Sequence, residues 1–174
     1  MKRKTKIAFI FTLICFLSFS LFAQQQETVE PVNWRELVPF LKDLPNWEAV
    51  DEATGQTMSM GMYSATNVER EYSSGEKVLT ISIIDGALSQ MAYAGFNMMR
   101  QFEVDTSDEF VKKVEIKEYP GIERYEYEYK NASVMLLVAE RFLIEIEITE
   151  AENTNEAKEI AEALDLDGLA DLVK

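Results

Sequence analysis

Hydrophobic and polar residues alternate along several stretches of the chain in the way expected for β-strands. In the segment 142–149, large apolar residues stand at every second position, and Glu145 and Glu147 stand between them. Because successive side chains of a strand point to opposite faces of a sheet, such a segment has one buried and one solvated face. Related patterns predict further strands at 47–51, 58–72, 78–85, 111–119, 122–129 and 132–139.

Three other segments have helical spacing, in which apolar residues recur at every third or fourth position. The first covers 34–41, with Asn33 as its N-cap, and Pro39 in its second turn divides or ends it. The second covers 86–102, and the third begins near Asn153. The expected buried stripe of the second helix is Leu88, Met91, Ala92, Gly95, Met99 and Phe102, and that of the third is Ala157, Ile160, Ala161 and Leu164.

The order of these elements predicts the fold class. Strands that follow one another through compact turns form an antiparallel sheet, and helices segregated from such a sheet define the α+β class. We therefore predict a single α+β domain over residues 33–174. Its antiparallel sheet has about six to seven strands and packs with an N-terminal, a central and a C-terminal helix.

Residues 1–23 have the features of a secretory signal peptide. A basic start is followed by the apolar run 7–22 and by Ala23. We predict cleavage after Ala23, a flexible leader over 24–32, and a periplasmic or secreted protein with no stable membrane insertion. The alternative is an uncleaved N-terminal segment that anchors the protein in a membrane, although the apolar run is shorter than the roughly 20 residues of a comfortable span.

Composition excludes several kinds of chemistry. The chain has 31 Asp and Glu residues against 17 Lys and Arg, a net charge of -14. This charge argues against a nucleic-acid partner, because clustered basic side chains bind phosphate groups. There is no histidine, and the single cysteine, Cys15, lies in the predicted signal peptide. Since this removes Ser–His and Cys–His catalysis and imidazole metal sites, we expect no enzymatic activity and no cofactor.

A short run of alternating methionines is a candidate metal site. Met58, Met60 and Met62 would lie on one side of a strand, and thioether sulfur is a soft ligand that suits monovalent copper or silver. Alternating methionines also form an ordinary flexible apolar face of a sheet, and no histidine or further cysteine reinforces the site. The sequence leaves both interpretations open.

A row of tyrosines is a candidate ligand surface. Tyr125, Tyr127 and Tyr129 alternate with charged residues, so a continuous strand would place their rings on one face. Such rings can stack on flat apolar ligands, and they can equally cover a half-buried sheet face while their hydroxyl groups stay in water. The sequence does not choose between the two roles.

Several short motifs carry a resemblance to known proteins. They are Met58-Ser59-Met60-Gly61, Arg70-Glu71-Tyr72, the strand 78–85 that leads into a helix, Tyr119-Pro120-Gly121-Ile122, Arg141-Phe142-Leu143-Ile144 and Ala163-Leu164-Asp165-Leu166. In these motifs the chain resembles small exported bacterial proteins of the PsbP-like or Mog1-like α+β type, and more closely an uncharacterised family of small secreted bacterial proteins. The resemblance implies an antiparallel sheet flanked by helices and an accessory or binding role, and it brings no catalytic residues.

Together these observations predict an exported, non-enzymatic domain. We expect it to bind a partner protein or a small apolar ligand in the cell envelope. Two alternatives stay open: binding of a soft metal, copper or silver, through the three methionines, and a small hydrolase that uses two of the many carboxylates.

Overall fold

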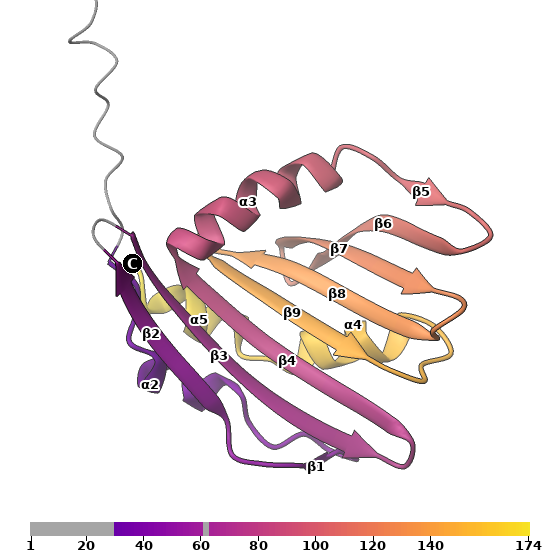
Figure 1. Cartoon of the computed structure of the whole chain (residues 1–174), viewed down its shortest axis with the longest axis horizontal. Helices are drawn as coiled ribbons and strands as arrows, with labels where there is room; N and C mark the ends of the chain where they lie inside the picture. Colours follow the sequence, from indigo (N-terminus) through magenta and orange to yellow (C-terminus); the bar gives the residue numbers. More distant parts are fainter. Residues whose placement is uncertain (1–29, 61–62) are drawn as a thin grey trace, which may run out of the picture.

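The chain folds into one twisted antiparallel sheet with short helices on both of its faces (Figure 1). This computed structural model describes residues 30–60 and 63–174, so the predicted signal peptide lies outside the described residues. Within them, nine strands form the sheet. Eight follow the order β1-β3-β4-β9-β8-β7-β6-β5, and the ninth, β2, pairs with the same edge of β3 as β1. The strands are β1 (Glu48–Ala49), β2 (Thr54–Met60), β3 (Tyr63–Ser74), β4 (Lys77–Gly86), β5 (Val104–Asp105), β6 (Glu109–Ile116), β7 (Tyr119–Glu126), β8 (Asn131–Val138) and β9 (Phe142–Ile148).

The helices are short and lie on opposite sides of the sheet. They are α2 (Trp34–Leu37), the 3-10 helix η1 (Val38–Phe40), α3 (Ala87–Met99), α4 (Asn155–Ala163) and α5 (Leu166–Asp171). In Figure 1, α3 lies in front of the sheet, and α4 and α5 lie behind it. Over the two described ranges, no helix has the length and apolar character needed to span a membrane.

The predicted fold class, α+β with about six to seven strands and three helices, is wrong, because the structure is a nine-stranded sheet with few and short helices. The pattern joined β2 and β3 into one strand and missed β5. The N-terminal helix is a single turn, since Pro39 has no amide hydrogen to donate to the Arg35 carbonyl. The C-terminal helix is divided at Leu164, whose backbone is extended, and Asp165 then caps α5 by accepting a hydrogen bond from the Gly168 amide.

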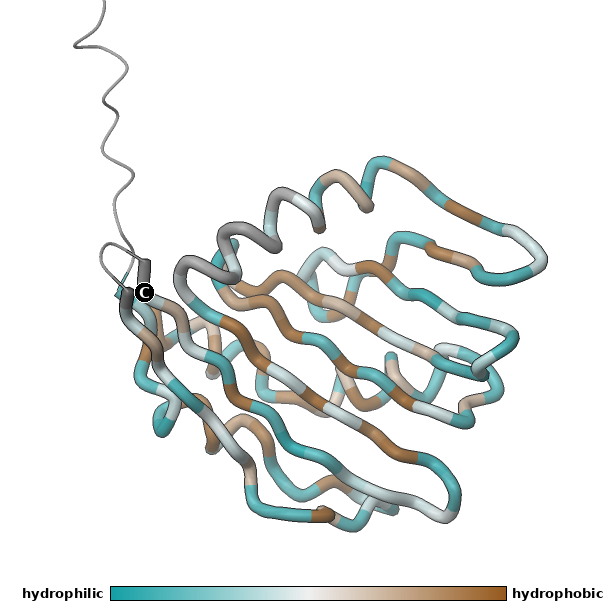
Figure 2. Tube along the Cα trace, in the orientation of Figure 1, coloured by the Kyte–Doolittle hydropathy of each residue, from teal (hydrophilic) through white to brown (hydrophobic). Residues whose placement is uncertain are grey.

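The main core lies on the face of the sheet toward α2, α4 and α5, termed here the inner face. Alternate residues of β4 and β9 are fully buried there, namely Leu79, Ile81, Ile83, Ile144, Ile146 and Ile148. The helices contribute Leu37, Ala157, Ile160, Ala161, Leu166 and Leu169. Figure 2 shows the resulting alternation of hydrophobic and hydrophilic residues along the central strands. Because each buried aliphatic side chain contributes about 1.5–3 kcal/mol, this layer dominates the stability of the fold.

The opposite face, termed the outer face, carries a second and smaller core under α3. Its buried members are Phe96, Ile122, Leu137 and Leu143. The predicted stripe of this helix is partly wrong, because Gly95 and Met99 are exposed, whereas Phe96, which the stripe did not include, is buried against the sheet. The side chains of the other predicted helix positions, Leu88, Met91 and Ala92, lie outside the described residues. Farther from α3, the outer face of β9 changes to the half-buried Glu145 and Glu147. One end of this face is therefore apolar and covered, and the other is polar.

Asp85 ties the N-terminal segment to the sheet. Its carboxylate is fully buried and accepts hydrogen bonds from the Arg141 guanidinium at 2.7 and 2.9 Å. It also accepts from the amides of Val32 and Gly86 at 2.7 and 2.6 Å, and Arg141 donates in addition to the Glu30 carbonyl at 2.7 Å. Since a buried carboxylate is tolerated only when it is paired and hydrogen-bonded, these contacts form a closed network. The last residues of the predicted leader are thus held against the sheet.

Gly86 makes the transition from β4 to α3. Its φ of 80° lies in the left-handed region that side chains rarely adopt. A Cβ atom at this position would also clash with the Ser64 carbonyl oxygen and approach Pro31. Only glycine therefore lets the chain turn sharply out of the sheet, and this turn directs α3 across the outer face.

Candidate functional site

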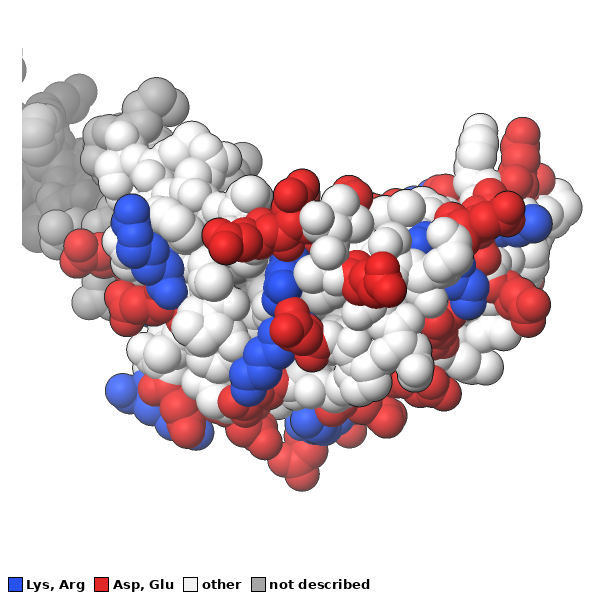
Figure 3. Space-filling model, turned by 90° about the horizontal axis from the view of Figure 1, so that it is seen from below, with Lys and Arg blue, Asp and Glu red and all other residues white. Residues whose placement is uncertain are grey.

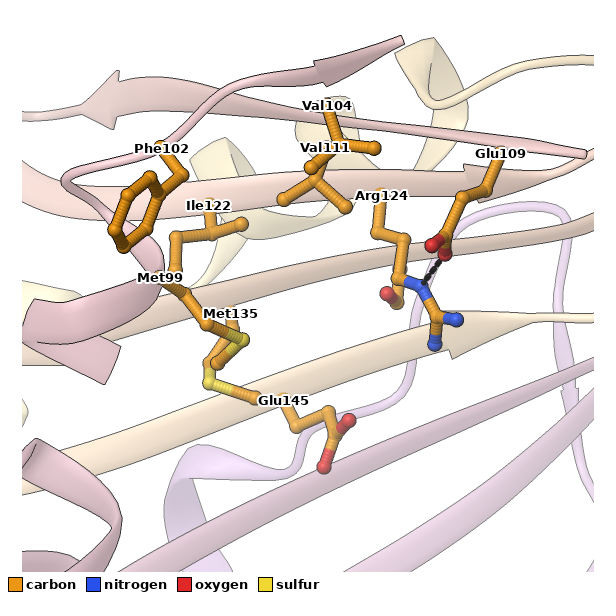
Figure 4. Close-up of a pocket in the computed structure, with 10 residues that line it drawn as sticks. Met99, Phe102, Val104, Glu109, Val111, Ile122, Arg124, Met135 and Glu145 are labelled. Atoms are coloured by element: carbon orange, nitrogen blue, oxygen red, sulfur yellow. Dashed lines mark hydrogen bonds and ion pairs between the residues drawn. The ribbon is translucent and has the colours of Figure 1, made fainter. Parts of the chain in front are cut away.

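A half-open pocket of about 480 Å³ lies between the C-terminal end of α3 and the outer face of the sheet (Figure 4). Its apolar lining consists of Met99, Phe102, Val104, Val111, Ile122 and Met135. Its polar lining consists of Glu109, Arg124, Ser133 and Glu145. A concave and mostly apolar site with a few polar groups is typical of small-molecule binding.

Two neighbouring rows of paired residues form the floor of the pocket. In the first row, Met135 of β8 is paired with Ile122 of β7 on one side and with Glu145 of β9 on the other. In the second row, Arg124 of β7 lies between Val111 of β6 and Ser133 of β8. Because paired residues of antiparallel strands point to the same face, the register of four strands brings these side chains together.

The wall of the pocket comes from the segment that leaves α3 and enters β5. This segment supplies Met99, Phe102 and Val104, and Val104 pairs with Val111 at the start of the β5–β6 hairpin. Phe102 is 57% exposed and Met99 is 43% exposed, and Met98 beside them is 64% exposed. Large apolar side chains gathered at the surface around a hollow indicate an interaction site more often than a structural one.

The charged residues of the pocket differ in how they are paired. The Arg124 guanidinium forms ion pairs with Glu109, at 2.6 Å, and with Glu126 on its own strand. The side-chain carboxylate of Glu145 forms neither a hydrogen bond nor an ion pair with any part of the chain that the structure describes. Burial of the Glu145 carboxyl, and secondarily the negative charge of Glu147, raise its pKa above the usual value of 4.5.

The raised pKa of Glu145 predicts a small stability gain when its charge is removed. An acid whose pKa is higher in the folded state destabilises the fold at pH values above that pKa, and this cost disappears as the pH falls below 4.5. We expect Glu145→Gln to increase the free energy of unfolding at neutral pH by less than about 1 kcal/mol, given solvent screening. Urea denaturation at neutral pH and below about pH 4 measures this difference, and the exposed Glu152→Gln should change neither value. A destabilised Glu145→Gln protein at neutral pH would contradict the prediction.

The structure does not bring the three predicted tyrosines together. Tyr125 is buried in the main core on the inner face, where its hydroxyl donates to the Ala151 carbonyl at 2.8 Å. The ring of Tyr127 meets that of Tyr125 edge to face, with centroids 5.4 Å apart, and is 45% exposed. Tyr129 is exposed and lies in the turn after β7. Because β7 ends at Glu126, the strand alternation on which the tyrosine row depends stops after its first member.

Only part of the methionine run can be placed. Met58 lies on β2 opposite Ala65, and its side chain is about half exposed. Met60 belongs to β2, but its side chain, like the whole of Met62, lies outside the described residues. Among the residues that the structure describes, no three Asp or Glu side chains are grouped as for a metal ion. The soft-metal alternative stays a prediction.

The pocket itself was missed by reasoning from the sequence. Alternation in the segment 142–149 correctly assigns Glu145 to the face opposite the main core, but it predicts solvent there and not a pocket. Helical spacing assigns Met99 and Phe102 to a buried stripe, whereas both side chains are exposed at the rim of the pocket. One feature of the sequence pointed to the pocket: the apolar stripe of the central helix continues to Phe102, beyond the end of α3 at Met99.

Comparisons with known proteins identify no relative of this chain. No protein-family model, no curated protein and no solved structure matches the chain. The resemblance to PsbP-like and Mog1-like proteins therefore stays a prediction, and the functional argument depends on the site alone.

Proposed function

We propose that this protein is an exported, non-enzymatic binding protein of the cell envelope, and that it holds a small ligand with an apolar body in the pocket of the outer face. The observation that carries the proposal is the half-open apolar hollow between the end of α3 and strands β6 to β9. Export follows from the signal peptide expected at residues 1–23.

The size and lining of the pocket support a small ligand. Ligand pockets usually have volumes of roughly 300–1,000 Å³, and the hollow of about 480 Å³ lies within that range. Phe102 and Met99 offer exposed apolar surface on the wall, and the half-buried Met135 lines the floor. A bound apolar group would remove this surface from water, which stabilises the complex by about 25 cal/mol for each Å².

The polar groups of the pocket favour binding over catalysis. Catalysis by Ser133 with a histidine base is excluded, because the chain contains no histidine. Arg124 and Glu109 are occupied with each other. These groups are suited to orient a ligand, a role that small numbers of polar side chains have in apolar pockets.

A fluorescence titration with N-phenyl-1-naphthylamine, an uncharged apolar probe, tests the proposal. We expect wild-type protein to bind the probe with an increase in its fluorescence. Phe102→Asp should weaken binding at least about 10-fold, because it replaces exposed apolar surface of the wall with a charge that the probe would desolvate. Since Phe102 is more than half exposed, the substitution should leave the fold intact.

Val50→Asp is the matched control for this experiment. Val50 is 48% exposed and lies just after β1, outside the pocket, and its substitution adds the same charge. Its affinity for the probe should equal that of the wild type. The proposal fails if wild-type protein does not bind the probe, or if Phe102→Asp binds it as tightly as Val50→Asp does.

A further inference from the structure

The charges around the pocket do not balance. Arg124 is the basic residue of the lining, and it is already neutralised by Glu109 and Glu126. Glu145 then contributes a negative charge that no described residue compensates. An anionic group entering the pocket would meet a paired arginine and an excess of carboxylates, whereas a cationic group would find one carboxylate free to bind it.

The groups that face Glu145 from the neighbouring strands strengthen this asymmetry. On its own strand the next residue of the same face is Glu147, which accepts a hydrogen bond from the Asn131 amide at 2.6 Å. On β4 the paired residue is the neutral Ser82, and beyond it on β3 stands Glu69. On β8 the paired residue is the neutral Met135. Arg124 on β7 is the basic residue that lines the same pocket. At the C-terminal end of α3, which covers this face, the basic residue is Arg100, whose guanidinium lies 5.8 Å from the centroid of the Phe96 ring and forms no ion pair with a described carboxylate.

Glu145 and the apolar wall lie in different parts of the pocket. In Figure 4, Phe102, Met99 and Ile122 lie on one side of the pocket, and Arg124 and Glu109 lie on the other. Glu145 lies next to Met135, below both groups in this view. A ligand whose apolar body lies against the wall would therefore have its polar end near the carboxylate of Glu145.

We propose that the ligand is an amphipathic amine, whose apolar body lies against Phe102, Met99 and Met135 and whose ammonium group forms an ion pair with Glu145. This inference depends on the proposed ligand-binding function and names the chemical class of the ligand. An ammonium group suits the site because it would provide the hydrogen-bond donors and the positive charge that Glu145 does not obtain from the described part of the chain. The pairing would also offset the cost of the half-buried carboxylate.

Titration calorimetry with three probes of equal chain length tests the inference. The probes are octylamine, 1-octanol and octanoate, which differ in the charge of one end. At neutral pH and low salt, we expect octylamine to bind wild-type protein at least about 10-fold more tightly than 1-octanol, and octanoate to bind more weakly than 1-octanol. Binding of octylamine should weaken as the pH falls and Glu145 takes up a proton.

Two variants separate recognition by Glu145 from general attraction to an acidic protein. Figure 3 shows many Asp and Glu side chains spread over one side of the molecule, and such a surface attracts any cation. Glu145→Gln should reduce the affinity for octylamine to the level at which the same variant binds 1-octanol. Glu152→Gln removes the same charge from an exposed position outside the pocket and should preserve the preference for the amine.

The outcomes distinguish the inference from the function on which it depends. Equal affinity of wild-type protein for octylamine and 1-octanol, tighter binding of octanoate, or an equal loss in both variants would overturn the amine inference while pocket binding stands. Failure of all three probes to bind would overturn the proposed function together with the inference. An amine preference that is lost in Glu145→Gln alone supports both.

Discussion

Replacing Asp85 with alanine is expected to lower the free energy of unfolding by about 3–5 kcal/mol, the usual cost of breaking a buried ion pair. The substitution would leave Arg141, whose side chain is 22% exposed, without its carboxylate partner. It would also leave the amides of Val32 and Gly86 without acceptors, and each unsatisfied buried donor costs about 1–3 kcal/mol. Because these contacts join the N-terminal segment, β4 and the turn before β9, the loss should extend to the start of α3.

Urea denaturation followed by circular dichroism measures this loss. Asp105→Ala is the matched control, since Asp105 is 67% exposed and its ion pair with Lys112, at 3.4 Å, should contribute less than about 1 kcal/mol. The double variant Asp85→Ala/Arg141→Met should recover part of the stability, because it no longer carries an uncompensated charge. If Asp85→Ala costs no more than Asp105→Ala, the buried network does not hold the N-terminal segment.

Replacing Phe96 with alanine is expected to have the second large effect, a loss of about 3–5 kcal/mol. Phe96 is a fully buried α3 side chain within the small core of the outer face, and Tyr93 of the same helix packs against that core. The truncation removes buried apolar surface and leaves a cavity that the neighbouring Ile122, Leu137 and Leu143 fill only in part. Since α3 and the segment after it form the wall of the pocket, probe binding should be lost as well.

Met98→Ala is the control for this prediction. Met98 lies two residues later on the same helix and is 64% exposed, so its truncation should change the free energy of unfolding by about 0.5 kcal/mol or less. Hydrogen exchange should show faster exchange of the α3 amides in Phe96→Ala than in Met98→Ala, because the docking of the helix is weakened. Equal exchange rates in the two variants would show that other contacts hold α3 on the sheet.

Local patterns predicted those elements whose two faces have different surroundings. In β9 the alternation correctly places Ile144, Ile146 and Ile148 in the core, with Glu145 on the opposite face. In the C-terminal helix the predicted stripe is buried as expected, at Ala157, Ile160, Ala161 and Leu164. These segments pack on the sheet with one face only, so periodicity alone identifies the buried side.

Local patterns failed for an element with apolar residues on most of its sides and for a strand of only two residues. In α3 apolar residues occur on most sides, and the spacing does not decide between Gly95 and Phe96 as the residue that faces the sheet. The two-residue strand β5 has too few positions to alternate and exists because Val104 pairs with Val111. The tyrosine row was interrupted by the end of β7, which depends on the turn to β8 and not on the alternation.

The sequence by itself determined that strands dominate the second half of the chain, which residues of the segment 142–149 face the main core, and that histidine-based and cysteine-based chemistry is absent from the expected mature protein. Those properties depend on residue type and on periods of a few residues. The candidate site depends on the tertiary structure. Its residues come from the end of α3, from the turn that follows it and from five strands, over the range 99–145. They meet because the register of β6 to β9 aligns two rows of side chains under the end of α3. Register and docking are settled by contacts between distant segments, which no local pattern encodes.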